Sequence, residues 1–379
     1  MAFLVHNLQT YYFMWKILKK YLYLGCIALF ALACQNRVLV EVDHYERSNE
    51  LDKAEAALNR HLESHPNDHA ARFRLGELHG RLQKYPEMLQ DFTAVENADA
   101  RWRDKIANSK EVYWRGNFNR GVAALNRAEL AQAIMPLQHA VLILPERHAA
   151  YPVLAGALLA TADSKNARAA LEKACALNAD DVESRHALLQ LYYNAGKNDE
   201  ALRVCDEILK KSSRDVSALR CRAFVLDKQQ SGQAEAAFKE LVRVTAASDD
   251  MTAFALHYYQ NAKYEFALLL FQEALKRRGE EATGTNGVSE TPADSNATSM
   301  YRSGKYAVPI PEIFRYLGDC AWHLGDYAAM SQWYTRLLQI DPNDVAALQN
   351  LWLAARAQGK MDLAEILKRK LDQLTSGQE

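Results

Sequence analysis

Histidines at regular spacing near residue 65 are the first residues whose types and positions suggest chemistry. His61, His65 and His69 recur every four residues, so two imidazoles on one helix face could bind a metal ion. However, His65 precedes Pro66, which predicts a turn there, and no carboxylate pattern completes a set of ligands. The pattern therefore favours a solvated helix end, and we expect no metal site.

Four cysteines follow residue 34, and their spacing favours packing over chemistry. None belongs to a CxxC pair, so a zinc site is not expected. Each falls within an expected helix, which predicts free buried thiols that pack as small apolar side chains. An oxidising compartment would permit a bridge between Cys205 and Cys221, and this alternative stays open. The four residues are Cys175, Cys205, Cys221 and Cys320.

Motifs of several enzyme classes are missing from the sequence. It has no glycine-rich phosphate loop, no GxSxG elbow and no HExxH motif. Lys and Arg total 46 against 47 Asp and Glu, a net charge of −1, which argues against general binding of nucleic acid. We therefore expect a protein that is not an enzyme, uses no cofactor and binds no nucleic acid.

The N-terminal segment has the layout of a secretory signal. Three lysines between residues 16 and 20 precede an apolar run of 13 residues over 21–33. A helix that spans a membrane needs about 20 residues, so a signal peptide over 1–33 is favoured. An uncleaved anchor helix is the alternative, and Met14 is an alternative start of translation.

The apolar run ends in ALFALAC, and this heptapeptide resembles a bacterial lipobox. The resemblance implies that Cys34 is lipidated and becomes the mature N-terminus, with residues 34–39 as a tether. Acyl chains would then hold the protein at a membrane, each buried CH₂ contributing about 0.8 kcal/mol.

The body of the chain repeats itself. The composition is 49% hydrophobic and 25% charged, as in globular proteins, and sixteen glycines and nine prolines are few for an all-β chain. Similar segments recur around one small-residue position, and six of the eight gaps between successive markers lie within one residue of 34. The markers are Ala54, Met88, Ala133, Ala167, Ala201, Ala234, Ala267, Met330 and Ala364.

This period and pattern resemble the tetratricopeptide repeat (TPR), a 34-residue helix-turn-helix repeat. The match is clearest at 311–344, and the residues that carry it there are Phe314, Leu317, Gly318, Ala321, Gly325, Asp326, Tyr327, Leu337, Asp341, Pro342 and Asn343. Residues 182–215 match nearly as well. The resemblance implies an all-α fold of about nine repeats, stacked as a right-handed superhelical solenoid over 40–278 and 309–379.

Two segments interrupt the period. Residues 101–113 are predicted as an off-period helix, and residues 279–308 as a disordered low-complexity insertion, because they are polar and have little to bury. A tolerated surface insertion is the favoured interpretation of 279–308, and a partner-binding tether is the alternative. Residues 309–379 are predicted to form the last two repeats and a C-terminal cap. Pro136 and Pro152 predict local helix bends.

The resemblance also indicates where a partner would bind. In this family a ligand usually lies along the inner faces of the first helices of the repeats. The Lys and Asn clamp of the chaperone-tail binders is absent, and the groove is instead aromatic. The alternative is that these aromatic residues pack against neighbouring helices. The predicted groove residues are Phe73, Phe118, His186, Gln190, Tyr193, Phe224, Tyr259, Arg315, Asp319 and Trp322.

Together these features predict a lipoprotein that acts as an interaction scaffold of the bacterial cell envelope. We expect it to be lipid-anchored to the cell membrane or outer membrane, facing the periplasm, and to bind a protein or peptide partner. A transport-accessory role, with a small apolar ligand in the groove, is the alternative.

Overall fold

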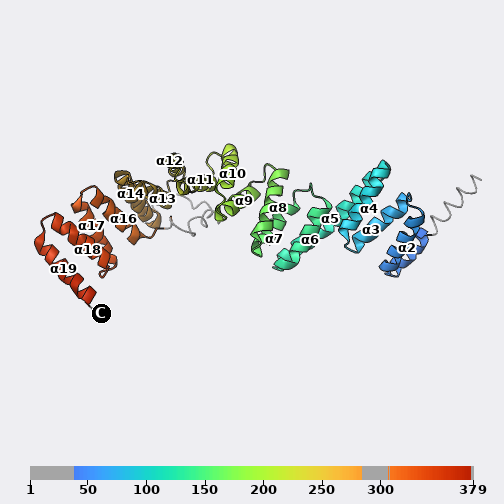
Figure 1. Ribbon diagram of the computed structural model, residues 1–379, viewed down its shortest axis with the longest axis horizontal. Helices are drawn as coiled ribbons and strands as arrows, with labels where there is room; N and C mark the ends of the chain where they lie inside the picture. Colours follow the sequence, from blue (N-terminus) through green and yellow to red (C-terminus); the bar gives the residue numbers. More distant parts are fainter. Residues whose placement is uncertain (1–37, 284–305, 307, 377–379) are drawn as a thin grey trace, which may run out of the picture. The chain divides into compact units, whose positions relative to one another are not determined.

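The structure is a computed structural model that describes residues 38–283, 306 and 308–376. The predicted signal peptide and Cys34 lie outside these residues. The all-α prediction is confirmed for the described residues, which contain helices and no strand. They divide into two compact units, one ending at Asn178 and one beginning at Ala179, and the helices of each can be followed by colour in Figure 1.

The first unit is a succession of helix hairpins. It begins with a helix over residues 38–47, so the last residues of the predicted tether are already helical. The helices that follow are α2 (Leu51–Ser64), α3 (His69–Arg81), α4 (Tyr85–Ala98), the 3₁₀ turn η1 (Ala100–Trp102), α5 (Arg103–Asn126), α6 (Leu130–Ile143), α7 (Ala150–Ala160) and α8 (Ser164–Leu177). Within it α3 packs on α4, α5 on α6 and α7 on α8, as the predicted repeats require.

The second unit continues with hairpins of the same kind. Here α9 packs on α10, α11 on α12, α13 on α14, α16 on α17 and α18 on α19. Their bounds are α9 (Val182–Asn194), α10 (Asn198–Lys211), α11 (Val216–Lys228), α12 (Ala234–Thr245), α13 (Ser248–Gln260), α14 (Tyr264–Thr283), α16 (Ile310–His323), α17 (Tyr327–Ile340), α18 (Val345–Ala357) and α19 (Met361–Ser376).

The residues chosen as repeat markers all lie in the cores of the hairpins. None of the nine is more than 5% exposed. Met88 and Met330, which break the small-residue rule, are 0% and 1% exposed, so their longer side chains are enclosed as completely as the alanines. On α16, a Cβ added to Gly318 would come within 2.5 Å of the Tyr334 ring, so the glycine leaves room for this aromatic side chain.

Aspartates set where many of the helices begin. In six helices the N-cap aspartate accepts a hydrogen bond from the backbone N–H three residues later, at 2.9–3.2 Å. Such a cap satisfies one of the unpaired donors of the first turn and contributes about 1 kcal/mol. The residues are Asp68, Asp163, Asp181, Asp215, Asp326 and Asp344.

Three predictions about irregular segments require correction. Residues 101–113 are helical, as predicted, but 103–113 are the first part of the 24-residue α5 rather than a helix of their own. The predicted disordered stretch 279–308 is too wide, because α14 extends to Thr283 and both Tyr306 and Val308 are buried. Pro152 lies in the first turn of α7, where a missing N–H costs no helical bond, so the bend predicted there is wrong. Pro136 lies inside α6, and the helix continues through it.

No helix in the described part of the chain has both the length and the apolar character needed to cross a membrane.

Candidate functional site

The predicted groove residues of the second unit lie on α9, α11, α13 and α16, the first helices of successive repeats. Positions 190, 224 and 319 are equivalent in their repeats, and so are positions 193, 227, 259 and 322. Residues three and four apart share a helix face, so these positions line one side of each helix. We use the term first-helix surface for the partly exposed members of this set, Gln190, Tyr193, Tyr259, Asp319 and Trp322.

On α9, the first-helix surface consists of Gln190 and Tyr193, whose polar atoms make few contacts within the fold. Gln190 donates from Nε2 to Oδ1 of Asn194 at 2.8 Å, while its Oε1 is buried and has no hydrogen-bond partner among the described residues. Tyr193 is half-buried, and burial raises its pKa to about 12. Its phenol therefore stays protonated at neutral pH and is available as a hydrogen-bond donor.

Two of the predicted ligand contacts, His186 and Arg315, instead join one repeat to the next. Each bonds the aspartate that caps the first helix of the next repeat, and Arg220 occupies the equivalent position of the repeat between 216 and 247. We call these three pairs the inter-repeat ladder. Its bonds are His186 Nε2–Asp215 Oδ2 at 2.9 Å, Arg220 Nε–Asp250 Oδ1 at 2.9 Å and Arg315 Nη2–Asp344 Oδ2 at 2.5 Å.

The inter-repeat ladder has a signal in the sequence that was not among the predictions. In each pair the acid follows its basic partner by 29 or 30 residues, and it lies at or near the start of a helix. Burial alone would raise the pKa of Asp215, but bonds from His186 and from the Ala218 N–H hold it below its ordinary value. His186 and Arg315 are thus engaged within the fold rather than offered to a ligand.

Phe224 lies in the core and not on the groove surface. Its side chain is 1% exposed, its ring stacks on that of Tyr306 with centroids 4.0 Å apart, and Phe238 lies beside it. This corrects its predicted role as an exposed groove residue, because Tyr306 covers the ring. Tyr306, its nearest aromatic neighbour, was not among the predicted site residues.

Tyr259, Asp319 and Trp322 lie where α13 meets α16. Asp319 accepts hydrogen bonds from Tyr334 at 2.5 Å and from Tyr259 at 3.4 Å. Burial, and next the Asp319 charge, raise the pKa of Tyr259 to about 12. Trp322 is 41% exposed and meets the ring of Tyr327 edge-on at 5.5 Å, so it is the most exposed large apolar side chain of the first-helix surface.

The two predicted groove residues of the first unit also serve packing. Phe73 is buried and stacks on Phe92, and its ring lies 5.1 Å from that of Trp102. Phe118 is half-buried and stacks on Trp114 with centroids 5.0 Å apart. Phe73 therefore follows the alternative that we left open, contact with neighbouring helices. Phe118 contacts Trp114 of its own helix α5 and packs against the buried cluster that includes Phe73 and Tyr85.

The first unit holds a buried histidine between two carboxylates. His79 on α3 approaches Asp91 Oδ2 through Nδ1 at 2.8 Å and Glu55 Oε1 through Nε2 at 3.3 Å. Burial lowers the pKa of His79, but the two carboxylates outweigh burial and raise it above its ordinary value of 6.5. The His79 side chain therefore connects α3 to α4 and to α2.

This arrangement predicts that stability of the first unit falls as the pH rises. A histidine whose pKa is raised by folding contributes fully below its unfolded pKa of about 6.5, and the contribution is lost as the pH rises through the folded pKa. Urea unfolding at a series of pH values above 6 should show this decline in the native protein, and His79→Gln should flatten it. His44→Gln, at an exposed position, is the control. An unchanged pH slope in His79→Gln would refute the assignment.

Other histidines and cysteines considered above contact neighbouring side chains of the fold. Among the described residues, no group of three or more His, Cys, Asp or Glu is placed to hold a metal ion. His61 bonds the cap residue Asp68 at 2.9 Å, and its ring stacks on His65. The cysteines of the described residues carry thiols and form no disulfide. A hydrogen bond with Cys205, together with burial, raises the pKa of Cys221.

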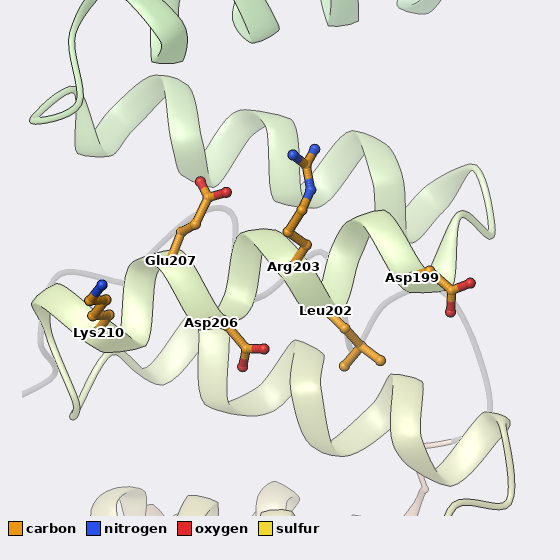
Figure 2. A pocket seen from close by; sticks show the side chains of 6 residues that line it. All are labelled: Asp199, Leu202, Arg203, Asp206, Glu207 and Lys210. Atoms are coloured by element: carbon orange, nitrogen blue, oxygen red, sulfur yellow. The ribbon is translucent and has the colours of Figure 1, made fainter.

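Hollows in the surface lie away from the predicted groove residues. One, of about 500 Å³, is lined by six residues of α10: Asp199, Leu202, Arg203, Asp206, Glu207 and Lys210. Figure 2 shows that these side chains leave a single helix in different directions, so they converge on no common point. A second, of about 490 Å³, lies between α18 and α19 and includes Trp352 and Leu371. Neither brings together groups that could act on a substrate.

Three stretches of the chain match a family model described as Tetratricopeptide repeat, at residues 39–104, 153–216 and 301–345. Cellulose synthase operon protein C of Xanthomonas axonopodis pv. citri (strain 306) is 29% identical over 161 residues. That alignment covers 42% of this chain and 10% of the relative, so the chain matches about a tenth of the relative's length.

Solved structures that match parts of the chain include MamA, YrrB and PilF. MamA is 14% identical, with 47% of this chain and 98% of MamA covered and a TM-score of 0.42. YrrB, described as a TPR protein with an unusual peptide-binding site, is 15% identical, with 49% and 90% covered and a TM-score of 0.38. PilF of Pseudomonas aeruginosa is 15% identical, with 63% and 97% covered and a TM-score of 0.39.

Proposed function

Because the chain belongs to the tetratricopeptide-repeat family, we propose that it is an interaction scaffold whose first-helix surface binds a protein or peptide partner. The exposure of Trp322 carries this proposal. Trp322 is 41% exposed and follows Asp319 by three residues on α16, so it offers a large apolar face on the same side of the helix as a hydrogen-bonding group. Anchors of this composition dominate the binding energy of protein interfaces.

Polar groups along the same surface supply directional contacts. The Oε1 of Gln190 has no partner in the described part of the chain, but it is buried, so it would accept from a backbone N–H of an extended peptide only after the side chain turns outward. The phenol of Tyr193 is protonated at neutral pH, as a tyrosine ordinarily is, and it can donate a hydrogen bond. One acceptor and one donor on α9, and an aromatic anchor on α16 three repeats further along the chain, suit an elongated partner, either a peptide or a helix.

The second part of the proposal is that acyl chains on Cys34 hold this scaffold at the cell membrane or outer membrane, facing the periplasm. Its support is the positively charged and apolar N-terminal segment that ends in ALFALAC.

A small-ligand-binding protein is the weaker candidate. It would need Phe224, Tyr259 and Trp322 around one cavity, whereas each ring has different neighbours. Phe224 contacts Tyr306, Tyr259 approaches Asp319, and Trp322 meets Tyr327. An open surface for a macromolecular partner therefore fits these contacts better.

Partner capture tests the proposal. A C-terminally tagged chain with Cys34 intact is solubilised from native membranes in detergent, and co-purifying proteins are identified by mass spectrometry. We expect one envelope protein in near-stoichiometric amount, and Trp322→Ala should reduce its capture about thirtyfold, the effect of losing a hot-spot anchor of about 2 kcal/mol. Cys34→Ala should move the chain out of the membrane fraction.

The matched control is Leu269→Ala, which removes an exposed apolar side chain, 62% exposed, from the second helix α14. Capture should be unchanged in this variant. Equal capture by the native chain and by folded Trp322→Ala would contradict the proposed surface, and a membrane-bound Cys34→Ala chain would contradict the lipid anchor.

A further inference from the structure

Tyr306 is buried although it lies at the end of a polar stretch of sequence. Its side chain is 7% exposed, and its ring lies nearly parallel to that of Phe224, at 17° and 4.0 Å. Its hydroxyl donates to Asp227 Oδ2 at 2.6 Å, 79 residues earlier in the chain. Both partners lie on α11, at the two repeat positions that correspond to Asp319 and Trp322 on α16.

The groups around Tyr306 form a pocket that matches a phenol at both ends. The Phe224 ring covers the aromatic face, and the Asp227 carboxylate accepts the hydroxyl proton. The other Asp227 oxygen is bonded to His257 Nδ1 on α13 at 2.6 Å, which fixes the direction of the carboxylate. Burial and the Asp227 charge raise the pKa of Tyr306 far above its ordinary value, so the hydroxyl remains a donor.

A second contact holds the backbone of the same short segment. The carbonyl oxygen of Val308 accepts a hydrogen bond from Arg278 Nη1 on α14 at 3.1 Å, and Arg278 also pairs with Asp249 at 2.6 Å. The segment is thus held by an aromatic anchor, a side-chain hydroxyl and a main-chain carbonyl. These are the three kinds of contact by which domains hold extended peptides.

A buried carboxylate is an unusual choice if the pocket serves packing alone. Burying Asp227 costs free energy unless its oxygens are bonded, and apolar side chains of similar size would fill the same space without that cost. The carboxylate distinguishes tyrosine from phenylalanine, because only tyrosine supplies the hydroxyl. Such discrimination is useful in a recognition site and unnecessary in a hydrophobic core.

We propose that Phe224, Asp227 and His257 form a binding pocket for the tyrosine side chain of a peptide, and that Tyr306 occupies this pocket in cis. The proposal rests on the proposed function, because the pocket lies on the first helices that are expected to hold the partner. An occupant on the same chain has a high effective concentration, on the order of millimolar, so a partner must compete with Tyr306. Only a partner that presents a tyrosine, and that binds strongly enough to displace Tyr306, would therefore occupy the pocket.

A peptide added in trans tests the pocket directly. The probe is a fluorescein-labelled peptide with the sequence of residues 304–311, and its binding to the full chain is followed by fluorescence anisotropy. We expect Tyr306→Ala to bind this peptide at least tenfold more tightly than the native chain, because its pocket is vacated. The same peptide with Tyr306→Phe should bind the Tyr306→Ala chain about tenfold more weakly, since a hydrogen bond to a charged acceptor is lost.

Two further variants keep the test decisive. Tyr306→Phe in the full chain retains the ring in the core and should bind the tyrosine peptide with an affinity between those of the native chain and Tyr306→Ala. Adding Asp227→Asn to Tyr306→Ala should abolish the preference for the tyrosine peptide over the phenylalanine peptide. Circular dichroism checks that each variant is folded.

The proposal is overturned if neither folded Tyr306 variant binds the peptide more tightly than the native chain, or if both peptides bind equally. Tyr306 would then be a structural link between α11 and the start of α16. This assay uses no envelope partner, so its outcome is separate from the capture experiment. Loss of capture in Trp322→Ala without peptide binding would leave the scaffold standing and remove the tyrosine pocket.

Discussion

Replacing Asp250 with alanine should lower the free energy of unfolding of the second unit by about 3–5 kcal/mol. The Asp250 side chain is 0% exposed and accepts two hydrogen bonds from Arg220, from Nε at 2.9 Å and from Nη2 at 3.0 Å. The substitution removes both carboxylate oxygens while the guanidinium stays buried, at 7% exposure. Removal of one member of a buried pair costs far more than the pair itself contributes, because the remaining charge is poorly solvated.

Urea unfolding followed by circular dichroism measures this loss, and hydrogen exchange should locate it in α11 and α13. The double variant Arg220→Met with Asp250→Leu should recover much of the stability, since neither buried charge remains. Glu365→Gln, in the exposed pair with Arg369, is the control and should leave the transition unchanged. A loss below about 1 kcal/mol in Asp250→Ala would show that the inter-repeat ladder does not hold these repeats together.

Phe224→Ala should destabilise the second unit by about 3–5 kcal/mol, the usual cost of replacing a buried phenylalanine with alanine. The ring is 1% exposed and contacts Tyr306 and Phe238, so its removal leaves a cavity between α11 and α12. Trp322→Ala also removes an aromatic ring, but the Trp322 side chain is 41% exposed. This variant should therefore change the free energy of unfolding by less than about 1 kcal/mol.

The comparison of these two variants separates core residues from surface residues. Chemical denaturation of each, measured in the same buffer, gives the two losses directly. Equal losses would mean that the burial of Phe224 does not describe the protein in solution. The result also affects the interpretation of capture experiments. A variant that lacks Phe224 is destabilised, so a loss of capture in it does not identify a contact with a partner.

The helix hairpins could be predicted because the repeat is local. A buried marker such as Ala201 recurs at about 34 residues, and apolar residues at helical spacing surround it, so each hairpin is encoded within its own segment. The length of α5 could not be predicted from the 34-residue period alone. Residues 103–115 contain neither glycine nor proline, so nothing stops the helix before it joins the next repeat.

The site was harder to predict because its decisive contacts are distant in sequence. Position within the repeat predicts Tyr193, Tyr259 and Trp322 as groove residues. They lie on partly exposed helix faces, and their role in binding stays a prediction. The same rule placed Phe224 on the surface, since nothing near it in the sequence shows that Tyr306 will cover its ring. Tyr306 follows a polar stretch without periodicity, and no local pattern links it to Asp227.

The most direct test of the account is photo-cross-linking at position 322 in living cells. The photoreactive residue p-benzoylphenylalanine replaces Trp322 on the first-helix surface or, as the control, Leu269 on α14. If the first-helix surface binds a partner, illumination should join position 322 to one defined envelope protein and position 269 to none. The absence of a product at 322, or the same product from both positions, would contradict the assignment of this surface as the binding site.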